Sequence, residues 1–264
     1  MTDASRTIVL TIAGSDSGGG AGIQADLKTF ARFGVYGMSV ITAVTAQNTM
    51  GVRAWERVTP ALVGAQIDAV AEDLRPAAIK SGMLGDADVV RAVAEGVRRH
   101  ALSPYVLDPV MAASSGDALL TPDAISAIVA ELFPLASLVT PNLDEVGLLL
   151  GERPRDVPAM ERAARALAAQ HGARAALVKG GHLGGDELVD VLYDGRQLRR
   201  FSYPRIRTSS THGTGCTLSA AIAAALALGV PLLNAVELGL EYVHRAIASA
   251  PGLGSGHGPL NHFA

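Results

Sequence analysis

The sequence has few cysteines and lysines and no strongly charged segment. Its 264 residues include a single cysteine, Cys216, which rules out a disulfide within the chain and favours a reducing compartment. Only three of the 22 basic residues are lysine, namely Lys28, Lys80 and Lys179, so arginine supplies the remaining 19. The net charge is −3, and no basic block or aromatic-interleaved arginine patch occurs. Neither nucleic acid nor an anionic membrane surface is therefore an expected partner.

Long apolar runs are also missing. The N-terminus carries Asp3, and the apolar run that follows breaks at Gly14, so we expect no secretory signal peptide. The alanine-rich run after Ser219 stops at Gly229, which is too short to span a bilayer. With 49% hydrophobic and 18% charged residues, the chain can build a sizeable core. We expect a cytoplasmic globular protein with one domain over residues 1–264.

Short apolar runs alternate with helical patterns along most of the chain. The predicted strands are residues 7–13, 37–44, 77–80, 104–107, 137–140 and 175–179. The predicted helices are residues 23–33, 59–74, 86–100 and 121–132, one that opens at 141–145, and two apolar helices that close the chain. Asp194-Gly195 indicates a small β-hairpin near residues 189–203. The alternation predicts an α/β fold of three α/β/α layers, with a mainly parallel central sheet and helices on both faces.

Several polar and small residues follow directly after predicted strands. In open parallel sheets, ligands bind beyond the carboxyl ends of the strands. We therefore expect the residues at these ends to gather along one edge of the sheet, together with the loop Gly213–Cys216. They are Gly14, Gln47, Met83, Asp108, Asn142 and Lys179.

The loop that precedes the first C-terminal helix is the strongest local signal. Polar and glycine residues from Thr208 lead straight into an alanine-rich helix, so the amides of Gly213–Cys216 should lie unpaired at a helix N-terminus and bind an anion. Cys216 would lie in the first turn, where the helix dipole favours a thiolate. The alternative is a glycine-rich loop that only caps a core helix, with Cys216 as a small buried apolar residue.

Several other catalytic motifs are absent. The glycines of Gly18–Gly22 do not form a dinucleotide-binding fingerprint, because Ile23 occupies the place of its third glycine. The Gly-Lys-Ser/Thr of a phosphate-binding P-loop and the His-Glu-x-x-His of a zinc protease are also absent. His212 and Cys216 could be base and nucleophile of a cysteine hydrolase, although no third residue to orient them can be named. The remaining tail histidines are interpreted as surface or tail groups rather than metal ligands: His244, His257 and His262.

Three motifs together match a known family. They are Ala13–Thr29 (AGSDSGGGAGIQADLKT), Gln47-Asn48 and His212–Thr217 (HGTGCT), and the match continues to the tail Gly256–Phe263. On these residues the chain resembles the hydroxymethylpyrimidine/phosphomethylpyrimidine kinases of thiamine biosynthesis, which belong to the ribokinase-like superfamily. The resemblance implies ATP-dependent phosphorylation of 4-amino-5-hydroxymethyl-2-methylpyrimidine to the monophosphate and then to the diphosphate. It also implies Mg²⁺ and a homodimer.

The resemblance further implies a role for individual residues. The pyrimidine would be surrounded by Gly14, Asp26, Thr45, Gln47 and Met83. The nucleotide would be bound near Lys179, Asp108, Asn142 and His212, with Mg²⁺ at Glu145 and Asp108. The transferring phosphoryl group would be held by the amides of Gly213, Thr214, Gly215 and Cys216, with the Cys216 thiolate as the base. An Asn-x-x-Glu pattern such as Asn142–Glu145 also describes the first turn of any acid-capped helix.

One segment departs from the family pattern, and two other functions stay open. Family members often have lysine where this chain has Ser114, in a Ser/Gly-rich segment, Met111–Asp117, that is interpreted as a flap over the site. A pyridoxal kinase of the same fold is the nearest alternative enzyme. A pyrimidine- or nucleotide-binding protein without catalysis is the alternative from another class.

Overall fold

The computed structural model describes residues 7–111, 120–181 and 183–264. The predicted flap residue Ser114 lies outside these ranges. The strands are β1 (Ile8–Asp16), β2 (Tyr36–Asn48), β3 (Gly51–Arg57), β4 (Ala78–Ser81), β5 (Tyr105–Leu107), β6 (Leu138–Val139), β7 (Ala176–Val178), β8 (Glu187–Tyr193) and β9 (Leu198–Pro204). The α-helices are α1 (Gly22–Arg32), α2 (Pro60–Asp73), α3 (Ala87–Arg99), α4 (Pro122–Ala127), α5 (Leu143–Leu150), α6 (Val157–His171), α7 (Thr214–Ala227) and α8 (Leu232–Ala248).

These strands form one sheet in the order β3-β2-β1-β4-β5-β6-β7-β8-β9. Strands β2, β1, β4, β5, β6 and β7 run parallel to one another. Strand β3 at one edge and the β8–β9 hairpin at the other edge pair antiparallel. Because the parallel strands share one direction, their carboxyl ends meet at a single edge of the sheet. The predicted mainly parallel sheet and the hairpin near residues 189–203 are confirmed.

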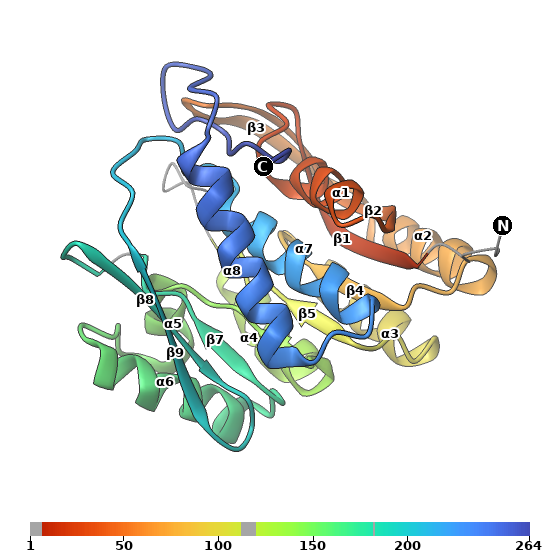
Figure 1. Cartoon of the computed structure of the whole chain (residues 1–264). Helices are drawn as coiled ribbons and strands as arrows, with labels where there is room; N and C mark the ends of the chain where they lie inside the picture. The colour runs from red at the N-terminus through yellow and green to blue at the C-terminus, as the bar shows by residue number, and fades with distance from the viewer. Residues whose placement is uncertain (1–6, 112–119, 182) are drawn as a thin grey trace, which may run out of the picture.

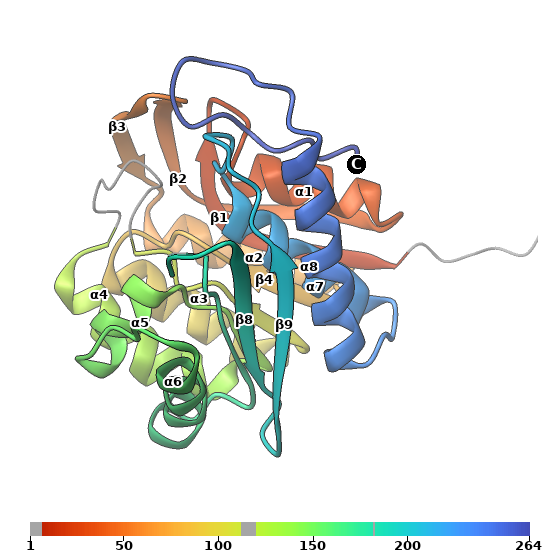
Figure 2. The same cartoon turned by 60° about the vertical axis from the view of Figure 1, so that its left-hand side comes forward.

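Helices cover both faces of the sheet, as Figures 1 and 2 show. On one face of the sheet, helices α1, α7 and α8 form an apolar core with strand residues such as Val106. On the other face, helices α2 to α6 form a second core with Tyr105 and Leu107, the residues on either side of Val106 in β5. This alternation follows from the two-residue period of a strand. Helix α7 is buried on all sides because it lies between the sheet and α8, which explains why Ala220–Ala225 is alanine throughout except for Ile222.

The structure corrects several sequence-based boundaries and adds a strand. Strand β2 continues through Asn48, so Gln47 lies within a strand and pairs with Val52 of β3, a strand that sequence reasoning missed because its residues are mostly exposed. The helix expected over 121–132 ends as an α-helix at Ala127 and continues as a π-helical turn, η1 (Ile128–Leu132), and a 3-10 turn, η2 (Phe133–Leu135). The proline within η2 has no N–H for an α-helical hydrogen bond.

Helix length also bears on membrane insertion. Across the described ranges, none of the helices is both long enough and apolar enough to traverse a bilayer.

Candidate active site

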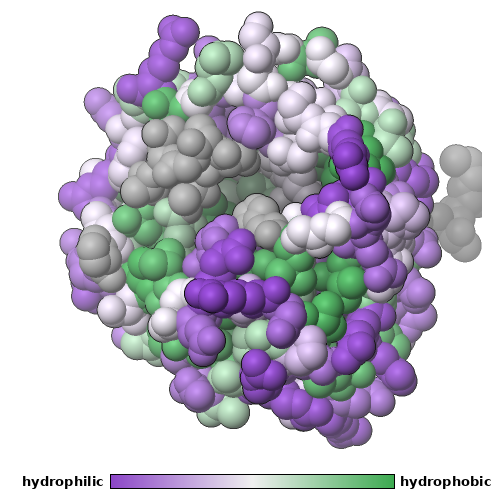
Figure 3. Space-filling model, turned by 90° about the vertical axis from the view of Figure 1, so that its left-hand side faces the viewer, coloured by the Kyte–Doolittle hydropathy of each residue, from purple (hydrophilic) through white to green (hydrophobic). Residues whose placement is uncertain are grey.

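The carboxyl edge of the sheet brings together a lysine, an aspartate and a threonine from three successive strand ends. Lys179 follows β7 and its Nζ lies 3.0 Å from Oδ1 of Asp108, which follows β5. The same Asp108 oxygen accepts a hydrogen bond of 3.0 Å from the Thr140 hydroxyl after β6. Backbone pairing of Lys179 with Asn142 holds the two strand ends in register. The expected convergence of Asp108, Asn142 and Lys179 at one edge is confirmed; Figure 3 is turned toward this side of the molecule.

The predicted anion-binding turn lies against this pair of charges. Helix α7 starts at Thr214, with Gly213 as its N-cap residue at φ 82°. A Cβ placed on Gly215 would lie 3.0 Å from Nζ of Lys179 and 3.3 Å from Oδ2 of Asp108. The Thr214 amide donates to the carbonyl of Thr211 at 3.3 Å, so it is less available to an anion than expected. The first turn of α7, with its amides, therefore lies beside the Lys179 ammonium, and Gly215 leaves room for that ammonium.

Gly213 also fixes where the turn lies. A Cβ at this position would be 1.9 Å from the carbonyl oxygen of Gly20, in the glycine loop after β1. Since φ there is 82°, glycine is required both for the backbone conformation and for the close approach. The two glycine-rich segments, far apart in sequence, are thus in direct backbone contact.

The surroundings of Cys216 disfavour ionisation of its thiol. Burial raises the pKa of the thiol to about 11, although nearby Lys80 and a backbone hydrogen bond from Gly22 favour the thiolate. Asp26 and Asp108 add to the increase. The lowered pKa expected from a helix N-terminus is therefore wrong for this thiol, because desolvation and two carboxylates outweigh the first-turn position.

Beneath Cys216 lies a buried ion pair that sequence reasoning missed. Nζ of Lys80 is 3.0 and 2.9 Å from the two carboxylate oxygens of Asp26, and Thr11 donates to the same carboxylate at 2.6 Å. Both charged side chains are 0% exposed. Asp26 was expected to contact the pyrimidine; in this structure its contacts are internal, and direct contact with a substrate stays a prediction. The unusual scarcity of lysine was the only sequence signal for Lys80.

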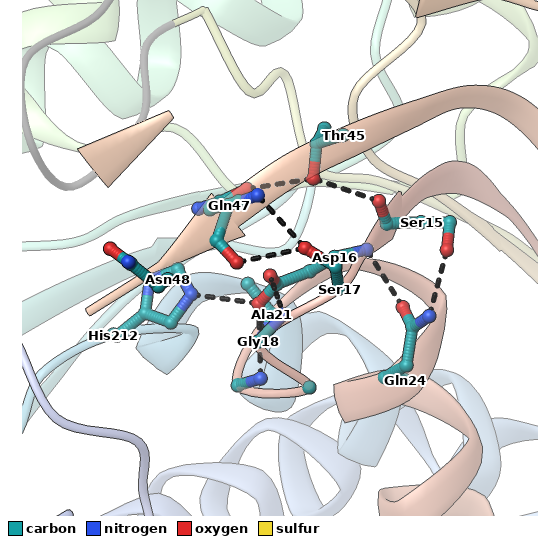
Figure 4. A network of polar contacts seen from close by, with 12 residues as sticks. Ser15, Asp16, Ser17, Gly18, Ala21, Gln24, Thr45, Gln47, Asn48 and His212 are labelled. Atoms are coloured by element: carbon teal, nitrogen blue, oxygen red, sulfur yellow. Dashed lines mark hydrogen bonds and ion pairs between the residues drawn. The ribbon is translucent and has the colours of Figure 1, made fainter. Parts of the chain in front are cut away.

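Apart from Asp26, the residues expected to surround the pyrimidine lie on β1 and β2 or just after β4. A Cβ on Gly14 would be 3.1 Å from Sδ of Met83, so Gly14, which lies within β1 and not after it as expected, packs against Met83. The Thr45 hydroxyl donates to the carbonyl of Ser15 at 3.0 Å and lies 3.3 Å from Oε1 of Gln47. Figure 4 shows Thr45 and Gln47 on β2 next to the start of the glycine loop.

Asp16 organises that glycine loop. Its carboxylate accepts hydrogen bonds from the amides of Gly18, Gly20 and Ala21 at 2.8, 3.0 and 2.9 Å, and Nε2 of His212 lies 2.8 Å away (Figure 4). Burial by itself raises the pKa of Asp16, but the His212 and amide hydrogen bonds outweigh it and lower that pKa. The imidazole of His212 therefore ties the anion-binding turn to the glycine loop, and its predicted contact with nucleotide stays a prediction.

Asn142 and Glu145 form a helix capping box. The Asn142 side chain accepts from the amides of Asp144 and Glu145, while Oε2 of Glu145 accepts from the Asn142 amide at 2.7 Å. Glu145 is nevertheless electrostatically part of the site: burial raises its pKa to about 7, Lys179 opposes the increase and Asp108 adds to it. Within the described residues no group of three or more His, Cys, Asp or Glu side chains could hold a metal ion. Two carboxylates suffice for Mg²⁺, which keeps several waters and phosphate oxygens as ligands.

Sequence comparison adds to this geometry. The family model described as phosphomethylpyrimidine kinase matches residues 16–261. The chain belongs to this kinase family. The hydroxymethylpyrimidine/phosphomethylpyrimidine kinase of Rhizobium meliloti is 56% identical over 97% of both chains.

Solved structures agree with the family and its fold. A phosphomethylpyrimidine kinase from Clostridium difficile is 42% identical, with a TM-score of 0.82 over 92% of this chain and 100% of its own. A pyridoxal kinase from Bacillus subtilis, solved as an ADP complex, is 36% identical, with a TM-score of 0.91 over 98% of both chains. The fold of this family member is thus ribokinase-like, and the expected enzyme class, a kinase, is confirmed.

Proposed function

We propose that this enzyme transfers the γ-phosphoryl group of ATP to the hydroxymethyl oxygen of 4-amino-5-hydroxymethyl-2-methylpyrimidine, and then phosphorylates the monophosphate to the diphosphate. The observation that supports this best is the position of Gly215, whose open side faces both Lys179 and Asp108. An anion held by the first-turn amides would meet the Lys179 ammonium directly. Family membership supports the same reaction.

The nucleotide side of the site would work by exchange of ion-pair partners. Lys179 is paired with Asp108 at 3.0 Å. A phosphate on the Gly215 and Cys216 amides offers Lys179 a second anion, so that Asp108 is released toward a cation. Asp108 and Glu145 are the residues that would hold Mg²⁺, whose positive charge neutralises the phosphate oxygens when it is bound. Phosphoryl transfer depends chiefly on such positioning and charge neutralisation.

The acceptor side would orient the aromatic alcohol. Gln47 offers both a donor and an acceptor to an aminopyrimidine edge, and Met83 beside Gly14 offers a polarizable surface for the ring. The Cys216 side chain accepts the hydroxyl proton only as a thiolate, and its pKa of about 11 makes that form rare at neutral pH. We therefore assign the larger part of the rate to the amides of Gly215 and Cys216, and proton acceptance by the thiolate to a smaller part.

Turnover with the pyrimidine alcohol and ATP tests the proposal. Mono- and diphosphate products are resolved by chromatography, and consumption of ATP must depend on the pyrimidine. Cys216→Ser should keep turnover within about 10-fold if the amides dominate, with a changed pH profile, because loss of a whole oxyanion donor typically costs ~10²–10³ in rate. If ATP consumption does not depend on the pyrimidine, the enzyme is not a kinase of this substrate. Full turnover of Cys216→Ser at every pH would exclude only the thiolate role.

Pyridoxal is the second candidate acceptor, because a pyridoxal kinase superimposes over 98% of the chain. Turnover of the two alcohols measured side by side under the same ATP concentration decides between them. We also infer a single cytoplasmic kinase domain that forms a homodimer, on the basis of the single cysteine, the one continuous sheet and the family resemblance. Light scattering should then give twice the chain mass of 27.1 kDa.

A further inference from the structure

The last residues of the chain, 256–264, form a segment that we call the C-terminal strap. In Figures 1 and 2 the dark-blue chain leaves the end of α8, forms a wide loop toward β3 and returns beside α1. Its histidines were expected to be surface or tail groups; His262 is a tail residue, and the structure shows that it is buried, with 3% of its surface exposed. The strap contacts three parts of the site described above, although none of its residues has a role in the proposed reaction.

The first contact is with the acceptor side. The His257 amide donates to the carbonyl of Thr49 at 2.8 Å, and the Gly256 amide lies 3.4 Å from the Thr49 hydroxyl. A Cβ on Gly256 would be 2.1 Å from the Thr49 carbonyl oxygen, so the strap lies directly on the backbone there. Thr49 follows the end of β2, which carries Thr45 and Gln47.

The second contact is with the anion-binding turn. The His212 amide donates to the carbonyl of Gly258 at 3.1 Å, and His212 forms a backbone bridge with Pro259. A Cβ on Gly20 would be 2.5 Å from the His212 ring and 3.1 Å from Cβ of Pro259. The strap therefore clamps the residue immediately before Gly213 against the glycine loop.

The third contact is with the first turn of α7. Nε2 of His262 and the hydroxyl of Thr217 share a hydrogen bond of 3.1 Å, and the Tyr242 hydroxyl of α8 donates to the His262 carbonyl at 2.8 Å. Thr217 is fully buried and follows Cys216 directly. At the end of the strap, Nε of Arg32 in α1 donates to the carbonyl of Ala264 at 2.8 Å. One short segment thus fastens α7, α8 and α1 together next to the reacting groups.

We propose that the C-terminal strap is a positioning element of the catalytic site and that His262 is its central positioning residue. Through Thr217 it sets where the first turn of α7 lies, and through Thr49 and His212 the strap fixes the distance between the acceptor side and the phosphoryl side. This inference rests on the proposed kinase function. Its physical basis is that an offset of about 1 Å between reacting groups can reduce a rate by about 10²-fold.

Variants of His262 test the inference. His262→Leu removes the hydrogen bond to Thr217, whereas His262→Gln keeps an amide that reaches the place of Nε2. We expect His262→Leu to lower kcat by about 10- to 100-fold with KM for the pyrimidine changed by less than about 3-fold, and His262→Gln to restore most of kcat. Thr217→Val removes the same bond from the other side and should not add to the effect of His262→Leu.

The neighbouring Phe263 provides the matched control, because it lies on the same strap but is 81% exposed. Phe263→Ala should leave kcat unchanged. A kcat of His262→Leu equal to that of Phe263→Ala would overturn the inference, as would additive effects of Thr217→Val and His262→Leu. Thermal unfolding of each variant identifies any that is unfolded at the assay temperature, in which case Thr217→Val alone decides.

A second readout does not depend on kinase activity. Because Cys216 is the only cysteine, its rate of alkylation by iodoacetamide reports the local geometry of the α7 start. We expect a change of about 3-fold or more in His262→Leu and none in His262→Gln or Phe263→Ala. If the wild-type protein shows no pyrimidine-dependent ATP consumption, the proposed function is refuted, but the alkylation rates still test the strap inference. Equal alkylation rates in all variants would refute the strap inference.

Discussion

Replacement of Lys80 by methionine should strongly lower the free energy of unfolding. Lys80→Met preserves the length of the side chain and removes its charge. Both members of the Lys80–Asp26 pair are 0% exposed, and both Asp26 oxygens lie within 3.0 Å of the ammonium. Among the described residues, the hydrogen-bond partner that the carboxylate would keep without Lys80 is the Thr11 hydroxyl. Breaking a buried pair from one side costs about 3–5 kcal/mol, and we expect a loss of that size in the free energy of unfolding.

The expected pH dependence sets this mechanism apart from a packing defect. Burial already raises the pKa of Asp26, and loss of the neighbouring ammonium raises it further. A carboxyl with a raised folded-state pKa binds its proton more tightly in the folded chain than in the unfolded one. The variant's own stability therefore falls as the pH rises above about 4, the pKa of an unfolded aspartate, and its deficit relative to wild type is smallest at low pH, where Asp26 is protonated in both proteins.

Urea unfolding followed by circular dichroism at several pH values measures both quantities. The double variant Lys80→Met/Asp26→Leu, in which no charge is left unpaired, should recover much of the loss. Arg91→Met removes one partner of an exposed pair, Arg91–Asp88, and serves as the control that should leave the midpoint unchanged. A loss below about 1 kcal/mol for Lys80→Met, or double-variant losses equal to the sum of the singles, would refute this account of the buried pair.

Three further predictions concern residues in and around the site. Gly213→Ala should abolish kinase turnover because its Cβ would lie 1.9 Å from a carbonyl oxygen. Gly229→Ala, at a similar φ of 81° but with nothing within 4 Å, should leave turnover unchanged and lower the free energy of unfolding by only about 1–2 kcal/mol. Burial raises the pKa of Asp190 to about 6, so its ionisation lowers stability as the pH rises from about 4 to 6; Asp190→Asn, which still accepts from the Gly180 amide, should remove that decline in urea titrations. Arg205 donates to the carbonyls of Gly181, Leu183 and Gly185, in the segment that follows Lys179. Arg205→Met should therefore raise KM for ATP, whereas Arg207→Met, which breaks an exposed pair, should not. Equal KM values in the two variants would contradict a role of Arg205 in holding this segment.

The sequence by itself determined the layers of the fold and most elements of the site. Apolar runs that alternate with helical patterns are local signals, and parallel strands with carboxyl ends at one edge follow from them. For that reason the meeting of Asp108, Asn142 and Lys179 was predictable. The glycine-rich turn before α7 was predictable as well, because helix N-termini and glycine spacing are written in neighbouring residues.

Only the tertiary structure decided the electrostatics and the long-range contacts. Whether Cys216 is a thiol depends on burial and on Asp26, Lys80 and Asp108, which come from three other segments of the chain. The hydrogen bond between His262 and Thr217 likewise joins residues 45 positions apart, and no local pattern predicts it. Desolvation and ion pairing depend on which distant side chains become neighbours, so they are properties of the folded molecule and not of any stretch of its sequence.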